Sequence, residues 1–218
     1  MHAIYSLVAG PLAWAAFVLF FGGILFRLIQ LLMMVSKTEK FIFSYMSLKY
    51  SLRSIVHWMV PFATANWRQH PVLTVVTFVF HLCLVITPIF LLSHMVLLDE
   101  SWSLSWWTLP DAVADVMTVL VIISCLFFLI RRVSRPEVQF VTDWTDYCIL
   151  AIVAAPFVTG FLAYHHYAVQ WMTILHMFCG EVMLAAIPFT RLSHMIFSPL
   201  TRAYMGSEFG KVRHARDW

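Results

Sequence analysis

The sequence predicts an all-α integral membrane protein: a bundle of five transmembrane helices, with the N-terminus outside the cell and the C-terminus in the cytoplasm. Three observations predict this class. Of the 218 residues, 61% are hydrophobic and 11% are charged, whereas a soluble domain carries about 25% charged residues. Apolar runs of membrane-spanning length occur five times. Lysine and arginine are confined to alternate connections between these runs.

Five segments reach the roughly 20 apolar residues that a spanning helix needs. The predicted helices cover residues 4–26, 72–97, 112–130, 147–164 and 170–190. No lysine or arginine precedes Arg27, and the first apolar run is too long for a signal peptide, so we interpret it as a retained helix. Pro88, Pro156 and Pro188 fall inside the second, fourth and fifth segments, where neighbouring groups can satisfy the carbonyls that proline leaves without donors.

The basic residues of the connections predict the orientation. Lysine and arginine occur in the connections 36–70 and 131–146 and in the tail 195–218. The connections 98–111 and 164–169 contain neither residue. Because positively charged loops stay in the cytoplasm, the N-terminus is expected to lie outside and the C-terminus in the cytoplasm.

Residues 45–67 mix basic and apolar side chains and predict a helix that lies along the cytoplasmic membrane surface. Two roles stand side by side for this segment: an anchor on the lipid surface, or a docking platform for a cytoplasmic subunit. No internal repeat divides the chain, so residues 1–218 are expected to form a single membrane domain, with a cytoplasmic tail from residue 195.

Four histidines lie in the apolar segments, His81 and His94 in the second and His176 and His194 in the fifth. An ionisable side chain in the membrane is a candidate functional residue. Antiparallel helices pair His81 with His194 near the cytoplasm and His94 with His176 near the exterior. If the second segment is a straight helix, His81 and His94 lie about 20 Å apart along it and near 140° out of phase. Pro88 could change the phase. On a straight fifth helix, His176 and His194 lie about 27 Å apart on one face. The pairs predict two haems, each held between two histidines.

Other polar residues carry weaker indications. A histidine in a membrane can also simply bond a carbonyl. Glu181, near the middle of the fifth segment, is open to a proton-handling role, a quinone-facing role or a structural hydrogen bond. The cysteines lie singly, without a CxxC or CxxCH motif, which argues against an iron–sulfur motif, structural zinc or covalently attached haem. They are Cys83, Cys125, Cys148 and Cys179.

The residues around these histidines resemble the respiratory nitrate reductase gamma-subunit family, which is the membrane cytochrome b of that enzyme. The C-terminal match follows the pattern H-x3-G-x7-P-F-[ST]-R-L-x-H, from His176 and Gly180 through residues 188–192 to His194. Another match lies after the third predicted helix. In the second predicted helix, Phe80 followed by His81 also matches the family. The match after the third helix comprises Arg131, Arg132, Pro136, Val138, Thr142 and Asp146.

This resemblance implies a five-helix cytochrome b with two b-type haems and an electron-transfer role within an oxidoreductase complex. It implies His81 and His194 as the inner ligands and His176 as an outer ligand. The chain departs from the family at the fourth ligand, which is expected ten residues after His81. That position is Leu91, and His94 lies three residues further on.

Several stretches resemble the branch of this family found in sulfate-reducing bacteria, among them PIFLLSH and SEFGKVRHARDW. That branch implies membership of a transmembrane redox complex such as the high-molecular-weight cytochrome complex. The implied partners are other integral membrane subunits, a periplasmic multihaem cytochrome c and a cytoplasmic iron–sulfur protein similar to heterodisulfide reductase. Menaquinone is a further candidate cofactor, and no nucleic-acid partner is expected.

A rival reading is a haem-free membrane anchor or a small transporter. Helices interrupted by proline and an acid at mid-membrane would suit transport. Against transport, the sequence has no inverted repeat, and Glu181 is the only acid deep in a predicted span.

Overall fold

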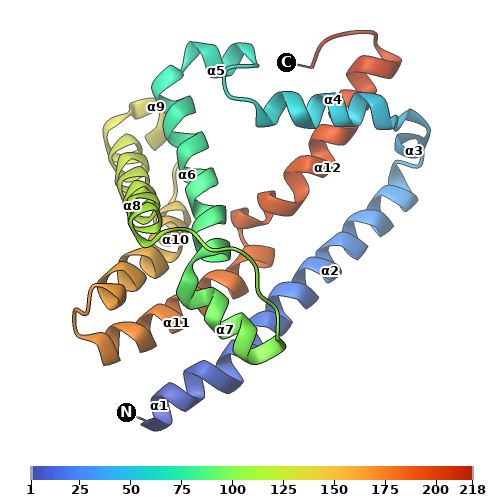
Figure 1. Cartoon of the computed structure of the whole chain (residues 1–218). Helices are drawn as coiled ribbons and strands as arrows, with labels where there is room; N and C mark the ends of the chain where they lie inside the picture. The colour runs from blue at the N-terminus through green and yellow to red at the C-terminus, as the bar shows by residue number, and fades with distance from the viewer. Residues whose placement is uncertain (1, 218) are drawn as a thin grey trace. The chain divides into compact units, whose positions relative to one another are not determined.

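In the computed structural model, which describes residues 2–217, the chain is all-helical, and no strand occurs between His2 and Asp217 (Figure 1). The α-helices are α1 (His2–Leu7), α2 (Ala13–Thr38), α3 (Phe41–Tyr45), α4 (Leu48–Met59), α5 (Ala65–Gln69), α6 (Pro71–Phe90), α7 (Leu92–Trp102), α8 (Asp111–Ser134), α9 (Pro136–Gln139), α10 (Trp144–Tyr164), α11 (Val169–Ala186) and α12 (His194–Ser207). Shorter helical turns are η1 (Val8–Leu12), η2 (Ile187–Phe189), η3 (Arg191–Ser193) and η4 (Glu208–Val212).

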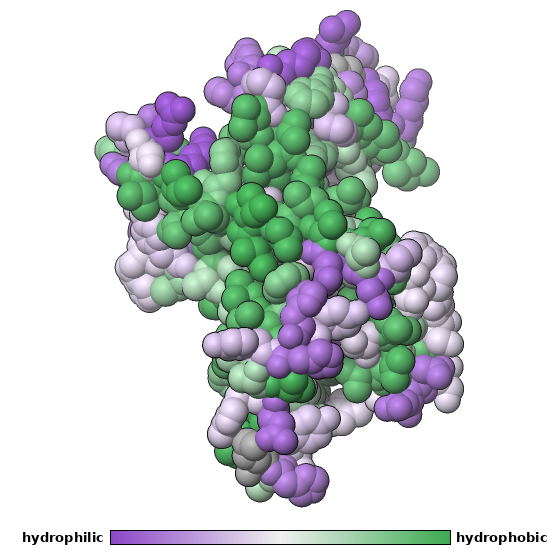
Figure 2. Space-filling view, turned by 60° about the vertical axis from the view of Figure 1, so that its left-hand side comes forward, coloured by the Kyte–Doolittle hydropathy of each residue, from purple (hydrophilic) through white to green (hydrophobic). Residues whose placement is uncertain are grey.

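Within the described residues 2–217, five helical segments are long and apolar enough to cross a membrane, which confirms the predicted class and number of spans. They are His2–Thr38, Pro71–Phe90, Asp111–Ser134, Trp144–Tyr164 and Val169–Phe189. At most 22% of the most apolar stretch of each is buried inside the protein. Hydrophobic residues cover much of the visible surface (Figure 2). Since water would not tolerate so much exposed apolar surface, the protein is a multi-pass membrane protein.

The first span is longer than predicted. The expected segment 4–26 continues in the structure to Thr38, so Arg27 lies inside α2 instead of at its end. The residues after Arg27 contain many leucines and methionines, which favour helix, and no glycine or proline. Lys37 in the last turn also suits the negative end of the helix dipole.

The second span is not one helix, which corrects the predicted segment 72–97. Helix α6 ends at Phe90, and Leu91 has the extended backbone angles φ −73° and ψ 132°. Helix α7 then starts in a new direction (Figure 1). The ring of Pro88 removes one helical hydrogen bond just before the break. The straight-helix distance and phase expected between His81 and His94 therefore do not apply.

The fifth span, Val169–Phe189, agrees with the predicted segment 170–190, but it is not one continuous α-helix, and a further helix follows in the predicted cytoplasmic tail. Helix α11 stops at Ala186, and the turns η2 and η3 follow before α12 begins at His194. Thr190 between these turns is extended; its hydroxyl donates to the Ala186 carbonyl at 2.8 Å and accepts from the Leu192 N–H at 3.2 Å. His176 and His194 therefore lie on different helices, so the straight-helix geometry expected between them does not apply.

The chain forms two compact units. One comprises Met1–Ala9 and Val75–Gly180, and the other comprises Gly10–Thr74 and Glu181–Trp218. His81, His94 and His176 belong to the first unit, and His194 belongs to the second.

The first unit is held together partly by a polar network between α8 and the start of α10. The guanidinium of Arg132 lies 3.6 Å from the Asp146 carboxylate and donates to the Thr142 hydroxyl at 3.2 Å. Asp146 is only 4% exposed and also accepts the backbone N–H of Asp143 at 3.1 Å, which caps α10. Three residues of the match after the third helix thus stabilise the fold in this unit.

In the second unit, α4 packs closely against α12 through small polar residues. The hydroxyls of Ser51 and Ser207 lie 2.9 Å apart, and a Cβ on Gly206 would lie 2.4 Å from the Ser54 Cβ. The opposite face of α4 is apolar and exposed, with Leu48 at 76% and Met59 at 70%. This helix therefore has a polar inner face and an apolar outer face, the reverse of a helix on a soluble protein.

Candidate functional site

Two of the four candidate ligands, His94 and His176, meet in the first unit. Their Nε2 atoms lie 3.5 Å apart, their ring centroids lie 5.8 Å apart, and their planes differ by 14°. Because the two nitrogens are much closer than the centroids, the rings lie end to end and point Nε2 at Nε2. The predicted outer pair is thus brought together by α7 and α11.

The break after α6 sets the direction of His94. Its Nδ1 lies 2.8 Å from the carbonyl oxygen of Pro88, six residues earlier. In a regular helix a side chain meets residues three and four positions away, so a partner six positions back lies out of reach. With Leu91 extended, α7 starts at a new angle and brings the ring of His94 back to the end of α6.

The neighbouring helix α10 holds His176. The Nδ1 of His176 lies 2.8 Å from the carbonyl oxygen of Pro156. One turn later on α10, Gly160 makes space for the ring, because a Cβ there would lie 2.8 Å from the His176 Cε1. Sequence reasoning did not identify Gly160; its position four residues after Pro156 in an apolar helix is the signal that could have found it.

These contacts assign the protons of both rings. A carbonyl oxygen only accepts hydrogen bonds, so each Nδ1 carries the hydrogen, and each Nε2 of a neutral ring presents a lone pair. Two lone pairs 3.5 Å apart repel each other unless a shared proton or a metal lies between them. Metal–imidazole bonds of about 2.0–2.1 Å would place two opposed ligands about 4 Å apart. The observed spacing is within about half an ångström of that arrangement.

The other two candidates show the same anchoring. Nδ1 of His81 lies 2.8 Å from the Thr77 carbonyl oxygen, and Nδ1 of His194 lies 2.8 Å from that of Arg191. A metal-bound histidine usually donates its second N–H in this way. By contrast, His57 and His165 use Nε2, toward the Ala63 carbonyl and the Asp115 carboxylate. The pairing of His81 with His194 across the two units stays a prediction.

The donor set fits a porphyrin better than a bare metal ion. Among residues 2–217, no group of three or more His, Cys, Asp and Glu side chains could hold a metal ion. Two opposed imidazoles supply two ligands, and a porphyrin supplies the remaining four. Gly180, one turn after His176 and hence on its face of the helix, has no atom within 4 Å of the position its Cβ would take. The surface of α11 is therefore open at this position.

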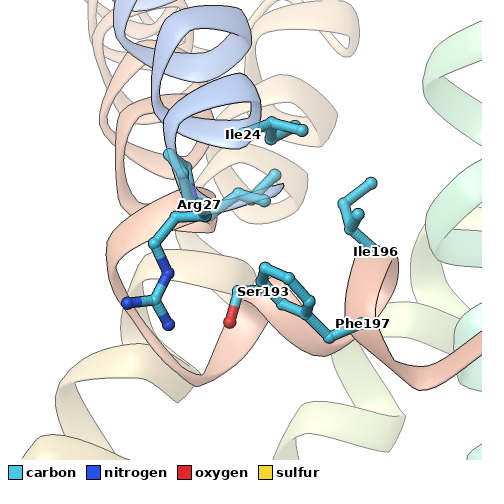
Figure 3. Close-up of a pocket in the computed structure, with 7 residues that line it drawn as sticks. Ile24, Arg27, Ser193, Ile196 and Phe197 are labelled. Carbon is cyan, nitrogen blue, oxygen red and sulfur yellow. The ribbon is translucent and has the colours of Figure 1, made fainter. Parts of the chain in front are cut away.

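Arg27 lies beside the segment that carries His194 in the second unit. Its guanidinium is 5.7 Å from the centroid of the Phe197 ring, and it lines a shallow pocket with Ser193, Ile196 and Phe197 (Figure 3). The pocket leaves no room for even a water molecule, so it is not a small-molecule site, which typically encloses roughly 300–1,000 Å³. The structure thus places a cation next to the segment that carries His194.

Glu181 lies on α11 as predicted and is buried, with 9% of its surface exposed. Its Oε2 has no hydrogen-bond partner among the described residues. The proton-handling, quinone-facing and structural roles of Glu181 therefore stay predictions.

Comparison with known proteins identifies one extensive relative. The chain is 38% identical over 216 residues to a protein from Nitratidesulfovibrio vulgaris (strain Hildenborough), a sulfate-reducing bacterium. The alignment covers 96% of this chain and 95% of the relative. No family model matches the chain. No solved structure matches it either.

Proposed function

We propose that this chain, which belongs to the same family as the Nitratidesulfovibrio vulgaris protein, is a membrane-embedded cytochrome b. In this proposal it carries electrons within a respiratory redox complex. The observation that supports it most is the pair of imidazoles of His94 and His176, which point Nε2 at Nε2 at 3.5 Å with both Nδ1 atoms anchored on carbonyls.

A haem with two histidine ligands has no open position for oxygen or substrate, so it supplies one-electron transfer and nothing else. The residues of this chain do the rest. The carbonyls of Pro88 and Pro156 hold the two rings in one tautomer and raise their basicity as ligands. The apolar helices keep water away from the site. Ligand basicity and burial together set the reduction potential.

We propose a second haem between His81 and His194, toward the cytoplasmic side. Nδ1 of each ring lies 2.8 Å from a backbone carbonyl oxygen, a contact that would hold the ring as a metal ligand. Arg27 would pair with a propionate of this haem, since guanidinium binds carboxylate through two parallel hydrogen bonds. The family resemblance around His194 points to the same ligand.

The positions of the basic residues support an orientation with the N-terminus outside, in a bacterial inner membrane. Electrons would then pass between a periplasmic multihaem cytochrome c or the menaquinone pool and a cytoplasmic iron–sulfur protein. The sulfate-reducing source of the relative agrees with the branch that implies these partners. The exposed apolar face of α4 supports its predicted place on the membrane surface, and its role there as a lipid anchor or as a docking platform for a cytoplasmic subunit stays open.

An optical spectrum of the purified full-length protein tests the proposal. We expect a reduced-minus-oxidised difference spectrum with the α band of b-type haem. The rival, a haem-free anchor or transporter, predicts a featureless spectrum. If membranes from cells supplied with a haem precursor still give a protein without that band, the proposed function is wrong.

A further inference from the structure

The helix break at Leu91 leaves three carbonyls at the end of α6 without their helical donors, and each has a replacement. The Pro88 carbonyl accepts from Nδ1 of His94 at 2.8 Å. The Ile89 carbonyl accepts from Nε1 of Trp106 at 3.0 Å, and the Phe90 carbonyl accepts from the backbone N–H of Leu109 at 2.9 Å. The connection after α7 therefore folds back and caps the broken helix.

Trp106 contacts both sides of the break. Its indole N–H holds the last turn of α6, and its backbone N–H lies 3.3 Å from the sulfur of Met95 on α7. Met95 is buried and directly follows His94 in the chain. The next residue, Trp107, stacks on Phe90 with ring centroids 4.3 Å apart, but its own indole N–H makes no hydrogen bond in the described residues.

We propose that Trp106 is a positioning residue for the outer haem ligand His94; this inference rests on the proposed function. The alternative to the break is a continuous helix, in which the backbone N–H of Ser93 would donate to the Ile89 carbonyl. The indole N–H of Trp106 satisfies that carbonyl in the broken form and so stabilises the break. Closing the helix would turn His94 away from both the Pro88 carbonyl and His176, because a regular helix cannot make the six-residue contact.

The test compares Trp106→Phe with Trp107→Phe in the full-length, haem-loaded protein. Both variants lose an indole N–H and keep an aromatic ring, but only the first loses the bond to the Ile89 carbonyl. Two readouts are needed: the low-spin EPR signal and midpoint potential of the outer haem, and hydrogen–deuterium exchange of the backbone around residues 89–95, which does not depend on haem.

We expect Trp106→Phe to shift the EPR signal and potential of the outer haem and to increase exchange at the break, while Trp107→Phe matches the wild type in both. Unchanged exchange and unchanged haem signals in Trp106→Phe would overturn the inference. Faster exchange with unchanged haem signals would overturn it as well, because the loop would then hold the break without positioning the ligand.

These results are distinct from failure of the proposed function. A wild-type protein without a b-type spectrum contradicts the proposed function and, with it, any role of Trp106 at a haem. The two contradicting results above are obtained with the haem in place, so they concern Trp106 alone.

Discussion

At the residue scale, the four histidines could be predicted from the sequence, but their directions could not. Their positions follow from polarity, since an ionisable side chain in an apolar segment needs a reason to be there. The direction of His94 follows from a carbonyl that is available only because the helix breaks three residues earlier. On an ideal helix, the side chains of His81 and His94 point in directions about 140° apart. The sequence spacing alone therefore does not explain how both could face the histidines of the fifth segment.

His94→Leu is expected to remove the outer haem, whereas Leu91→Ala should keep it. Leucine cannot bind iron, so the first change deletes one axial ligand. The second trims a half-buried side chain beside the break and should cost about 1–2 kcal/mol of stability, less than the larger losses in tight cores. Haem content by pyridine haemochrome and thermal denaturation in detergent measure the two effects. Haem loss in Leu91→Ala, or full haem content in His94→Leu, would contradict the assignment.

Gly160→Ala should disturb the outer haem from the opposite side. The added methyl group would lie 2.8 Å from the His176 Cε1, so the ring must turn or α10 and α11 must separate. We expect reduced haem occupancy or a shifted outer-haem spectrum. Gly22→Ala on α2 is the matched control, because a Cβ there meets no atom within 4 Å and replaces a helical glycine with a better helix former. Equal spectra for the two variants would argue against a tight fit between Gly160 and His176.

At the element scale, the helix breaks are what hydropathy could not predict. The hydropathy of the sequence stays high through Leu91, so it gives no sign that the helix ends there. Pro88 indicates only that a kink is possible nearby. The partners that stabilise the break are Trp106 and Leu109, which come from a later connection. Likewise, the end of α11 depends on the Thr190 hydroxyl acting on both sides of a turn. Such contacts form only after the chain has folded, so local sequence patterns do not contain them.

The network between α8 and α10 predicts a stability effect that does not need haem. Arg132→Ala removes the cation beside a carboxylate that is 4% exposed and should cost about 1–3 kcal/mol. Arg131→Ala, its neighbour, changes the same charge without that contact and should cost much less. Thermal unfolding in detergent compares the two, and a double-mutant cycle with Asp146→Asn isolates the pair. Additive effects in that cycle would show that Arg132 and Asp146 do not interact.

At the scale of the whole molecule, composition and hydropathy were sufficient for the class and the number of spans. The limits of the spans differ because hydropathy reports solvent and not backbone geometry: α2 continues to Thr38, and the fifth span is followed by a further helix. The predicted orientation and the single-domain organisation rest on charge and on the absence of repeats, and they stay predictions.

Labelling from the two sides of the membrane tests that orientation. Single cysteines replacing Lys49, Arg135 or Lys211 should resist a membrane-impermeant reagent in intact cells and react after the membrane is opened, because all three lie in connections assigned to the cytoplasm. A cysteine replacing Ser105, in a connection without lysine or arginine, should react in intact cells. The four native cysteines are replaced by serine or alanine in the background. The opposite labelling pattern would contradict the predicted orientation and would place the N-terminus in the cytoplasm.

The central claim is that paired histidines hold b-type haem, and the haem-to-protein ratio of the purified full-length chain tests it most directly. A pyridine haemochrome assay together with quantitative amino-acid analysis gives the ratio. Two haems per chain are predicted, one for His94 with His176 and one for His81 with His194. A ratio of one haem per chain would mean that only one of the two histidine pairs binds haem, and the haem content of His94→Leu would show which pair it is. A chain that binds no haem would contradict the account.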